Sequence, residues 1–135
     1  MAVFRGRHSA FVAIPKSHEF AEVSSIISSS LADLNIEEVT APLNFNPSLL
    51  EACKKADFVI CDITENNPST YYVIGASQAS QKPVLLLCKE SPATAPSEIS
   101  GFKVVRYRPD NVSAISKFLH LFVSEFLPEA MAAGG

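Results

Sequence analysis

Glycine is scarce in this chain and tryptophan is absent: 5 glycines and no Trp occur among 135 residues. The glycines form neither the G-x-G-x-x-G pattern of dinucleotide-binding folds nor the Walker pattern of P-loop proteins. The G-x-S-x-G elbow of the α/β-hydrolases is missing as well. These absences argue against classical dinucleotide oxidoreduction and against P-loop hydrolysis.

Basic residues do not outnumber acidic residues in this chain. The chain has 11 Lys and Arg against 14 Asp and Glu, a net charge of −3, and no basic stripe, so we expect no nucleic-acid partner. No apolar run approaches the length of a membrane span, and the apolar stretch 10–14 is too short for the core of a secretory signal. We therefore expect a cytoplasmic protein without a membrane partner.

Cysteine is sparse and odd in number. The chain has 3 cysteines; Cys61 and Cys88 lie inside apolar runs, and Cys53 lies on a helical pattern. No spacing resembles a metal site, so we expect buried, reduced thiols and neither a metal nor a cofactor.

Length and composition favour a single domain. A chain of 135 residues that is 47% hydrophobic is large enough to build a full core. We expect residues 1–7 to be a lead-in, residues 8–128 to form one α/β domain, and residues 129–135 to be a tail.

The stretch 56–88 organises the chain as one β-α-β unit. An apolar run, 58–61, is closed by Asp62, and a second apolar run covers 83–88. Continuous apolar runs are typical of strands buried on both faces of a parallel sheet. Between the two runs, residues 69–81 read as a helix, with Asn67 as its N-cap and Pro68 at its first position.

The remaining elements alternate in the same way. Strands are predicted over residues 8–14, 36–41 and 103–107, the second being a partly exposed edge strand. A helix capped by Ser17 is predicted to end at Asn35, a second is predicted from Pro47 to Lys55, and a third is capped by Asp110. The last helix, which follows Asp110, has an unusually wide apolar stripe, formed by Val112, Ile115, Phe118, Leu119, Phe122, Val123 and Phe126.

This alternation predicts a flavodoxin-like three-layer α/β sandwich. We expect a five-stranded parallel sheet with the order 2-1-3-4-5. In that order a ligand crevice lies at the carboxyl ends of strands 1 and 3, where the loops 15–18 and 62–69 meet.

An anion site is predicted at this crevice. The backbone N–H groups of Ser69, Thr70 and Tyr71 open a helix, and helix starts attract phosphates. The loop Pro15, Lys16, Ser17 and His18 adds positive charge beside it, although His18 is also explained as an exposed first-turn residue.

Two carboxylates and two tyrosines complete the candidate site. Asp62 either binds a ligand or closes an Asx turn, and Glu65 either reaches the crevice or is a solvated loop charge. Of Tyr71 and Tyr72, one is expected to pack on the core while the other presents its ring to the crevice.

The stretch 56–88 resembles the signature of the nucleoside 2-deoxyribosyltransferase-like superfamily and its TIR-like nucleotide-binding relatives. Their pattern is a strand ending in Asp-Leu-Thr, then Asn-Pro-Asn, Tyr-Glu-Leu-Gly, a small-residue helix and Gly-Lys-Pro-Val. The matching residues here are Asp62, Ile63, Thr64, Asn67, Pro68, Tyr72, Gly75, Ala76, Ala79, Lys82, Pro83 and Val84.

The resemblance implies a flavodoxin-like fold, a nucleoside or nucleotide ligand and a homodimer or higher homo-oligomer. It also implies that the glutamate of Tyr-Glu-Leu-Gly acts at the ribosyl anomeric carbon. This chain has Val73 at that position, and an isopropyl group neither attacks nor stabilises a cationic ribosyl ring.

Two hypotheses follow from this departure. The first is a catalytically degenerate domain that binds a nucleoside, a nucleotide or a protein partner, with Val73 at the ligand. The second is an enzyme that cleaves or transfers at an N-glycosidic bond with Asp62 or Glu65 as its carboxylate. A third interpretation keeps the fold only as a scaffold, with tyrosines filling the crevice.

Overall fold

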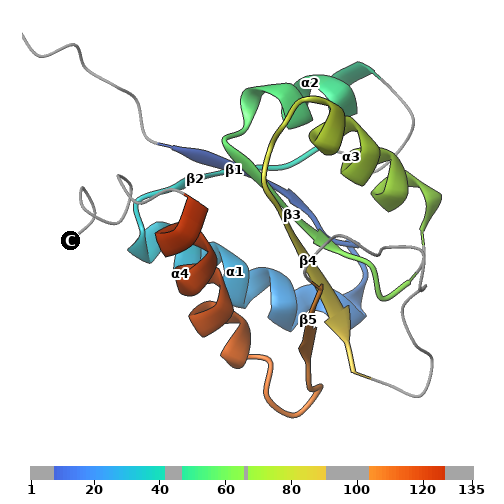
Figure 1. Cartoon of the computed structure of the whole chain (residues 1–135). Helices are drawn as coiled ribbons and strands as arrows, with labels where there is room; N and C mark the ends of the chain where they lie inside the picture. Colours follow the sequence, from blue (N-terminus) through green and yellow to red (C-terminus); the bar gives the residue numbers. More distant parts are fainter. Residues whose placement is uncertain (1–7, 42–46, 66, 91–103, 127–135) are drawn as a thin grey trace, which may run out of the picture.

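The computed structural model describes residues 8–41, 47–65, 67–90 and 104–126. Strands and helices alternate along the described chain (Figure 1). The elements are β1 (Ser9–Ala13), the 3₁₀ turn η1 (His18–Phe20), α1 (Ala21–Asp33), β2 (Glu37–Val39), α2 (Pro47–Lys55), β3 (Phe58–Asp62), α3 (Pro68–Ala79), β4 (Val84–Lys89), β5 (Val104–Tyr107) and α4 (Ala114–Phe126).

The strands form one parallel 5-stranded sheet in the order β2-β1-β3-β4-β5. The predicted fold class and strand order are therefore confirmed. In the register, Ala13 pairs with Cys61, so the carboxyl ends of β1 and β3 are adjacent. This adjacency brings the loops after β1 and β3 to the same edge of the sheet.

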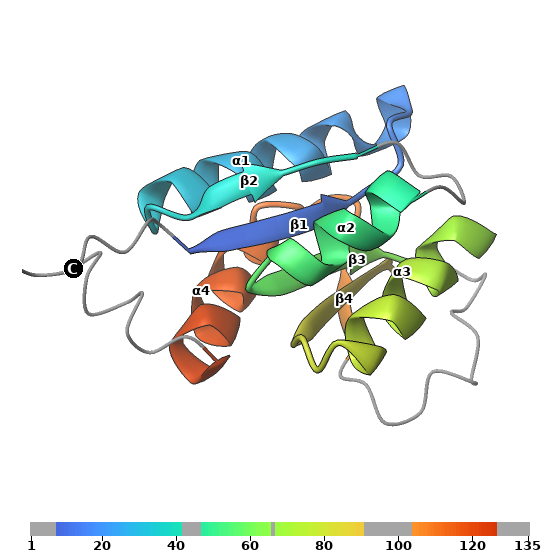
Figure 2. The same cartoon turned by 90° about the horizontal axis from the view of Figure 1, so that it is seen from above.

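Two helices cover each face of the sheet (Figures 1 and 2). Side chains alternate between the faces, as strand geometry requires: Ala10 and Val12 join the core under α1 and α4, whereas Phe11 and Ala13 join the core under α2 and α3. Because both faces are covered, β3 is buried along its whole length, which explains its continuous apolar run.

The edge strand β2 is short and polar, as predicted. Glu37 and Glu38 are exposed, and the Ser28 hydroxyl donates a hydrogen bond of 2.7 Å to the Glu38 carboxylate. Charged side chains on an edge strand discourage pairing with a further strand.

The ends of α1 and α3 follow their local chemistry. Asn67 caps α3, because its side-chain oxygen accepts a hydrogen bond of 2.8 Å from the Ser69 N–H. Asn35, after α1, and Gln81, after α3, adopt positive φ values of 56° and 58°, the left-handed conformation that commonly ends a helix.

Two predicted helix caps are wrong. Ser17 precedes the 3₁₀ turn η1 rather than an α-helix, and its side chain makes no capping hydrogen bond. Asp110 does not cap α4, which begins at Ala114. The carboxylate of Asp110 instead binds the Arg108 guanidinium through hydrogen bonds of 3.0 and 3.1 Å, and this bidentate pair occupies the oxygens that a cap would need.

Four predicted segments lie largely or wholly outside the described residues: the lead-in 1–7, the loop around residues 43–46, the loop after residue 90 and the tail 129–135. Within the part of the chain that the structure describes, no helix is long and apolar enough to cross a membrane.

Replacing Asn67 by Ala removes the acceptor that caps α3, so we expect the free energy of unfolding to fall by about 1 kcal/mol. Ser17→Ala is the matched control, because Ser17 occupies a cap position without a capping hydrogen bond. Urea denaturation of the two variants compares them directly. Equal losses in both would contradict the assignment of Asn67 as the effective cap.

Candidate functional site

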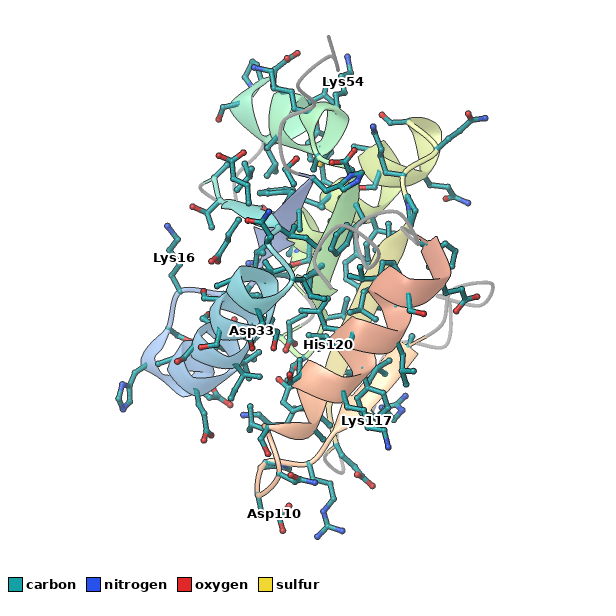
Figure 3. The ribbon with its side chains drawn as sticks, turned by 90° about the vertical axis from the view of Figure 1, so that its left-hand side faces the viewer. Lys16, Asp33, Lys54, Asp110, Lys117 and His120 are labelled. Atoms are coloured by element: carbon teal, nitrogen blue, oxygen red, sulfur yellow. The ribbon has the colours of Figure 1, made fainter. Side chains whose placement is uncertain are left out.

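The candidate site lies at the carboxyl edge of β1 and β3. From the β1 loop, Pro15 is buried, while Lys16, Ser17 and His18 are exposed. Figure 3 shows the Lys16 side chain projecting away from the body of the domain. The structure therefore places the predicted cationic side chains at this edge, in contact with solvent.

Asp62 ends β3 and is only 1% exposed. One carboxylate oxygen accepts a hydrogen bond of 2.8 Å from the Thr64 N–H, which closes an Asx turn. The other oxygen accepts a hydrogen bond of 2.6 Å from the Tyr107 hydroxyl of β5. Both oxygens of this carboxylate are thus bound to other groups of the protein.

Electrostatics at Asp62 are set by burial. Burial raises the pKa of the Asp62 carboxyl above its ordinary value, while the hydrogen bonds from Thr64 and Tyr107 oppose that rise. Burial, with the neighbouring carboxylate, also raises the pKa of Tyr107. The Tyr107 hydroxyl therefore keeps its proton and remains a donor to Asp62.

Lys89 extends this network toward β1. Its backbone N–H donates a hydrogen bond of 2.8 Å to the Thr64 hydroxyl. Its ammonium group forms an ion pair of 2.9 Å with Glu19 and lies 5.2 Å from the centroid of the Phe20 ring. Five residues therefore form one polar network at the carboxyl edge of the sheet: Glu19, Asp62, Thr64, Lys89 and Tyr107.

Sequence reasoning missed Lys89 and Tyr107 as members of this site. Each is the last residue of its strand, β4 or β5. In a parallel sheet, all strands end at the same edge, where α/β proteins hold their ligands. Both residues could therefore have been predicted from their positions at the carboxyl ends of the last two strands.

The first turn of α3 is built around Asn67. The Ser69 N–H binds the Asn67 side chain, and the Thr70 N–H binds the Asn67 backbone oxygen at 3.0 Å. Ser69 is 6% exposed and Thr70 is fully buried. The Thr70 hydroxyl has no hydrogen-bond partner. An anion at this turn would share the Ser69 and Thr70 N–H groups with Asn67.

Val73 is fully buried, in the core between the sheet and α3. Tyr71 packs partly against the same core, while Tyr72 is 36% exposed. Tyr71 thus lies inward and Tyr72 outward, and the predicted contact of one tyrosine ring with a ligand stays a prediction. Val73, which was predicted to lie at the ligand, is thus closed off from solvent in this structure.

Glu65 and the cysteines differ in exposure. Glu65 is exposed in the turn after β3, whereas Cys53, Cys61 and Cys88 are buried free thiols. Burial raises the pKa of all three thiols, so they stay protonated and are poor nucleophiles. No group of three or more His, Cys, Asp or Glu in the described ranges could hold a metal ion.

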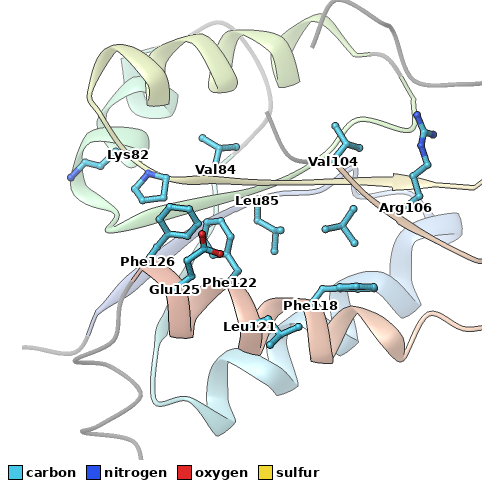
Figure 4. Close-up of a pocket in the computed structure, with 12 residues that line it drawn as sticks. Lys82, Val84, Leu85, Val104, Arg106, Phe118, Leu121, Phe122, Glu125 and Phe126 are labelled. Carbon is cyan, nitrogen blue, oxygen red and sulfur yellow. The ribbon is translucent and has the colours of Figure 1, made fainter. Parts of the chain in front are cut away.

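A cavity of about 630 Å³ lies away from this edge, between β4, β5 and α4 (Figure 4). Its walls are largely apolar and include Phe118, Phe122 and Phe126. None of the side chains predicted to bind a ligand lines it. The cavity is therefore separate from the crevice that the sequence indicates.

No family model matches the sequence, and no curated protein matches it. Solved structures share its fold. A CMP N-glycosidase of Clostridium botulinum has a TM-score of 0.57 at 18% identity, covering 84% of this chain and 98% of its own. A 2-deoxyribosyltransferase of Bacillus psychrosaccharolyticus has a TM-score of 0.55 at 20% identity, covering 78% of this chain and 90% of its own.

The same fold also occurs in other functional classes. The sugar isomerase domain of an RpiR transcription factor from Sphaerobacter thermophilus has a TM-score of 0.58 at 17% identity, covering 96% of this chain and 76% of its own. The chain therefore has the Rossmann-like fold of the N-glycosidase and deoxyribosyltransferase structures, and the fold alone does not select their chemistry.

The buried Asp62 carboxyl predicts an unusual pH dependence. Because its pKa is raised in the folded state, protonation favours folding: this contribution is complete below the ordinary Asp pKa and is lost as pH rises through the folded pKa. Relative to Asp62→Asn, the wild-type free energy of unfolding should therefore fall as the pH rises above the ordinary Asp pKa of about 4.

Asp110→Asn is the control for this measurement. Arg108 lowers the pKa of the Asp110 carboxyl, so its contribution is complete above about pH 4, and the wild type should lose stability relative to Asp110→Asn only as the pH falls below that value. Urea denaturation across the pH range gives both trends. The same sign for both variants would contradict the description of Asp62.

Proposed function

We propose that this chain is a catalytically degenerate nucleoside 2-deoxyribosyltransferase-like domain that binds a nucleoside or nucleotide at the carboxyl edge of β1 and β3. The observation that carries the proposal is the complete burial of Val73. The motif that this chain resembles has its catalytic glutamate there, and here the position carries an apolar side chain turned into the core. The site therefore lacks the carboxylate that the N-glycosidic reaction requires.

Asp62 does not replace the missing carboxylate. Its oxygens accept hydrogen bonds from Thr64 and Tyr107, and it is enclosed by protein. To act as a nucleophile it would have to leave both donors, and burial favours its protonated form. These features support binding without bond cleavage.

The ligand class is supported by the motif and by two structural neighbours, a CMP N-glycosidase and a 2-deoxyribosyltransferase. We place a ligand phosphate at the first turn of α3, where the helix dipole favours an anion. Lys16 is an exposed cation in the loop after β1, which lies at the same edge of the sheet. The other predicted anion position, at η1, is less favourable because Glu19 lies there.

Enzymatic cleavage at an N-glycosidic bond is the second candidate function. The observation in its favour is Glu65, an exposed carboxylate only three residues after Asp62. Within the described ranges Glu65 forms no ion pair, so its carboxylate is open to a substrate. Release of free base by the native protein, lost in Glu65→Ala and retained in Glu22→Ala, would favour this alternative.

Thermal shift with CMP, cytidine, other nucleoside monophosphates and NAD tests the binding proposal. A bound ligand raises the melting temperature in proportion to the logarithm of its concentration, and we expect monophosphates to give larger shifts than their nucleosides. Asn67→Ala should reduce the shift. If no compound raises the melting temperature, the binding proposal is wrong; if cytidine and CMP shift it equally, the phosphate position is wrong.

Replacing Val73 by the glutamate of the motif tests whether the side chain of residue 73 is buried. Val73→Glu introduces a carboxylate without a partner into the core, so we expect a loss of several kcal/mol, roughly the 2–7 kcal/mol of an unpaired buried polar group. Gln78→Glu, on an exposed position in the last turn of the same helix, is the matched control and should cost no more than about 1 kcal/mol, the cost of an acidic charge at a helix C-terminus. Unchanged stability of Val73→Glu in urea denaturation would show that residue 73 reaches solvent.

A further inference from the structure

The outer side of α4 combines exposed apolar residues with the cavity beside it. Leu121 is 58% exposed and Phe126 is 47% exposed. Both line the cavity between α4, β4 and β5 (Figure 4). We call the outer side of α4 together with this cavity the α4 face. Large apolar side chains beside an open cavity are typical of a surface that receives a partner.

The outer side of α4 carries a basic and an acidic residue, and they do not pair with each other. Lys117, Leu121 and Glu125 are all exposed and follow at intervals of four residues, so they form one stripe along α4. Figure 3 shows Lys117 on the outside of the domain. The two charged residues are each about 6 Å along the axis from Leu121, on opposite sides of it. They are therefore too far apart to pair with each other.

Each charge also opposes the helix dipole. Lys117 lies near the positive N-terminal end of α4, and Glu125 lies near its negative C-terminal end. Each such placement costs about 0.3–1 kcal/mol at an exposed position. No ion pair within the described part of the chain offsets this cost for either residue. The positions of Lys117 and Glu125 thus destabilise α4 itself, which indicates that the two charges serve contacts with another molecule.

We infer that the α4 face binds a second copy of this chain, with the two α4 helices antiparallel across a two-fold axis at Leu121. This arrangement brings Lys117 of each copy opposite Glu125 of the other, so two ion pairs form across the axis. A parallel arrangement would bring like charges together instead. Self-complementarity of one surface is what a two-fold interface requires.

The apolar part of the face fits the same arrangement. With Leu121 at the axis, the Leu121 side chains of the two copies meet at the mouth of the cavity, next to Phe118 and Phe122. Leucine and phenylalanine contacts thus form the centre of the interface, and charges form its rim. The inference does not depend on the proposed function.

Charge reversal tests this geometry. The single variants Lys117→Glu and Glu125→Lys each place like charges across the axis, whereas the double variant restores two ion pairs with their signs exchanged. The reversals also align both charges with the helix dipole, so loss of the dimer cannot be ascribed to unfolding of α4. Sedimentation equilibrium over a range of protein concentrations measures the dimer dissociation constant for each protein.

We expect the wild type to reach twice the chain mass of 14.6 kDa, the single variants to dissociate about tenfold more readily, which corresponds to about 1.4 kcal/mol, and the double variant to return to the wild-type constant. Leu121→Glu should be monomeric, and Lys54→Glu on α2 should match the wild type. A monomeric wild type at high micromolar concentration would overturn the inference. So would single variants that dimerise normally, or a double variant that is not rescued.

Discussion

The hydrogen bond between the Tyr107 hydroxyl and the Asp62 carboxylate holds the carboxyl edge of the sheet together. A buried carboxylate is tolerated only when its oxygens have donors, and Tyr107 supplies one from β5 across the end of β4. Thr64 supplies the second donor and accepts from the Lys89 backbone. Lys89 then binds Glu19 of η1. One polar network therefore fixes the ends of β3, β4 and β5 and the turn after β1.

This network occupies the edge at which folds of this kind bind ligands. Asp62 accepts hydrogen bonds on both oxygens, and Val73 of α3 is buried in the core. Lys16, His18 and Glu65 are among the exposed residues of the loops at this edge. These exposed polar side chains are the ones that a ligand at this edge would meet first.

Local chemistry predicted much of the fold. The apolar run ending at Asp62 and the Asn67-Pro68 pair defined β3 and the start of α3, because burial on two faces and helix capping each leave a signature over a few adjacent residues. The strand order followed from the alternation of strands and helices. The same reasoning failed at Asp110, where a side-chain pair with Arg108 competed with the expected cap.

The site was less predictable than the fold. The Asx alternative for Asp62 could be stated from the sequence, but its partner Tyr107 lies 45 residues away, and no local pattern encodes such a contact. The inward direction of Val73 depends on how α3 lies on the sheet. The apolar stripe of α4 was predicted as wide, and only the structure separates its buried residues, such as Leu119 and Val123, from the exposed Phe126.

The central claim is that Asp62 serves the structure and is unavailable for chemistry, and a carbon-13 NMR titration of its carboxyl group tests this most directly. We expect an Asp62 pKa above its ordinary value, a Tyr107 hydroxyl proton that exchanges slowly, and no change in either on adding CMP. An Asp62 pKa at or below the ordinary value, or a carboxyl resonance that shifts when the nucleotide binds, would contradict it.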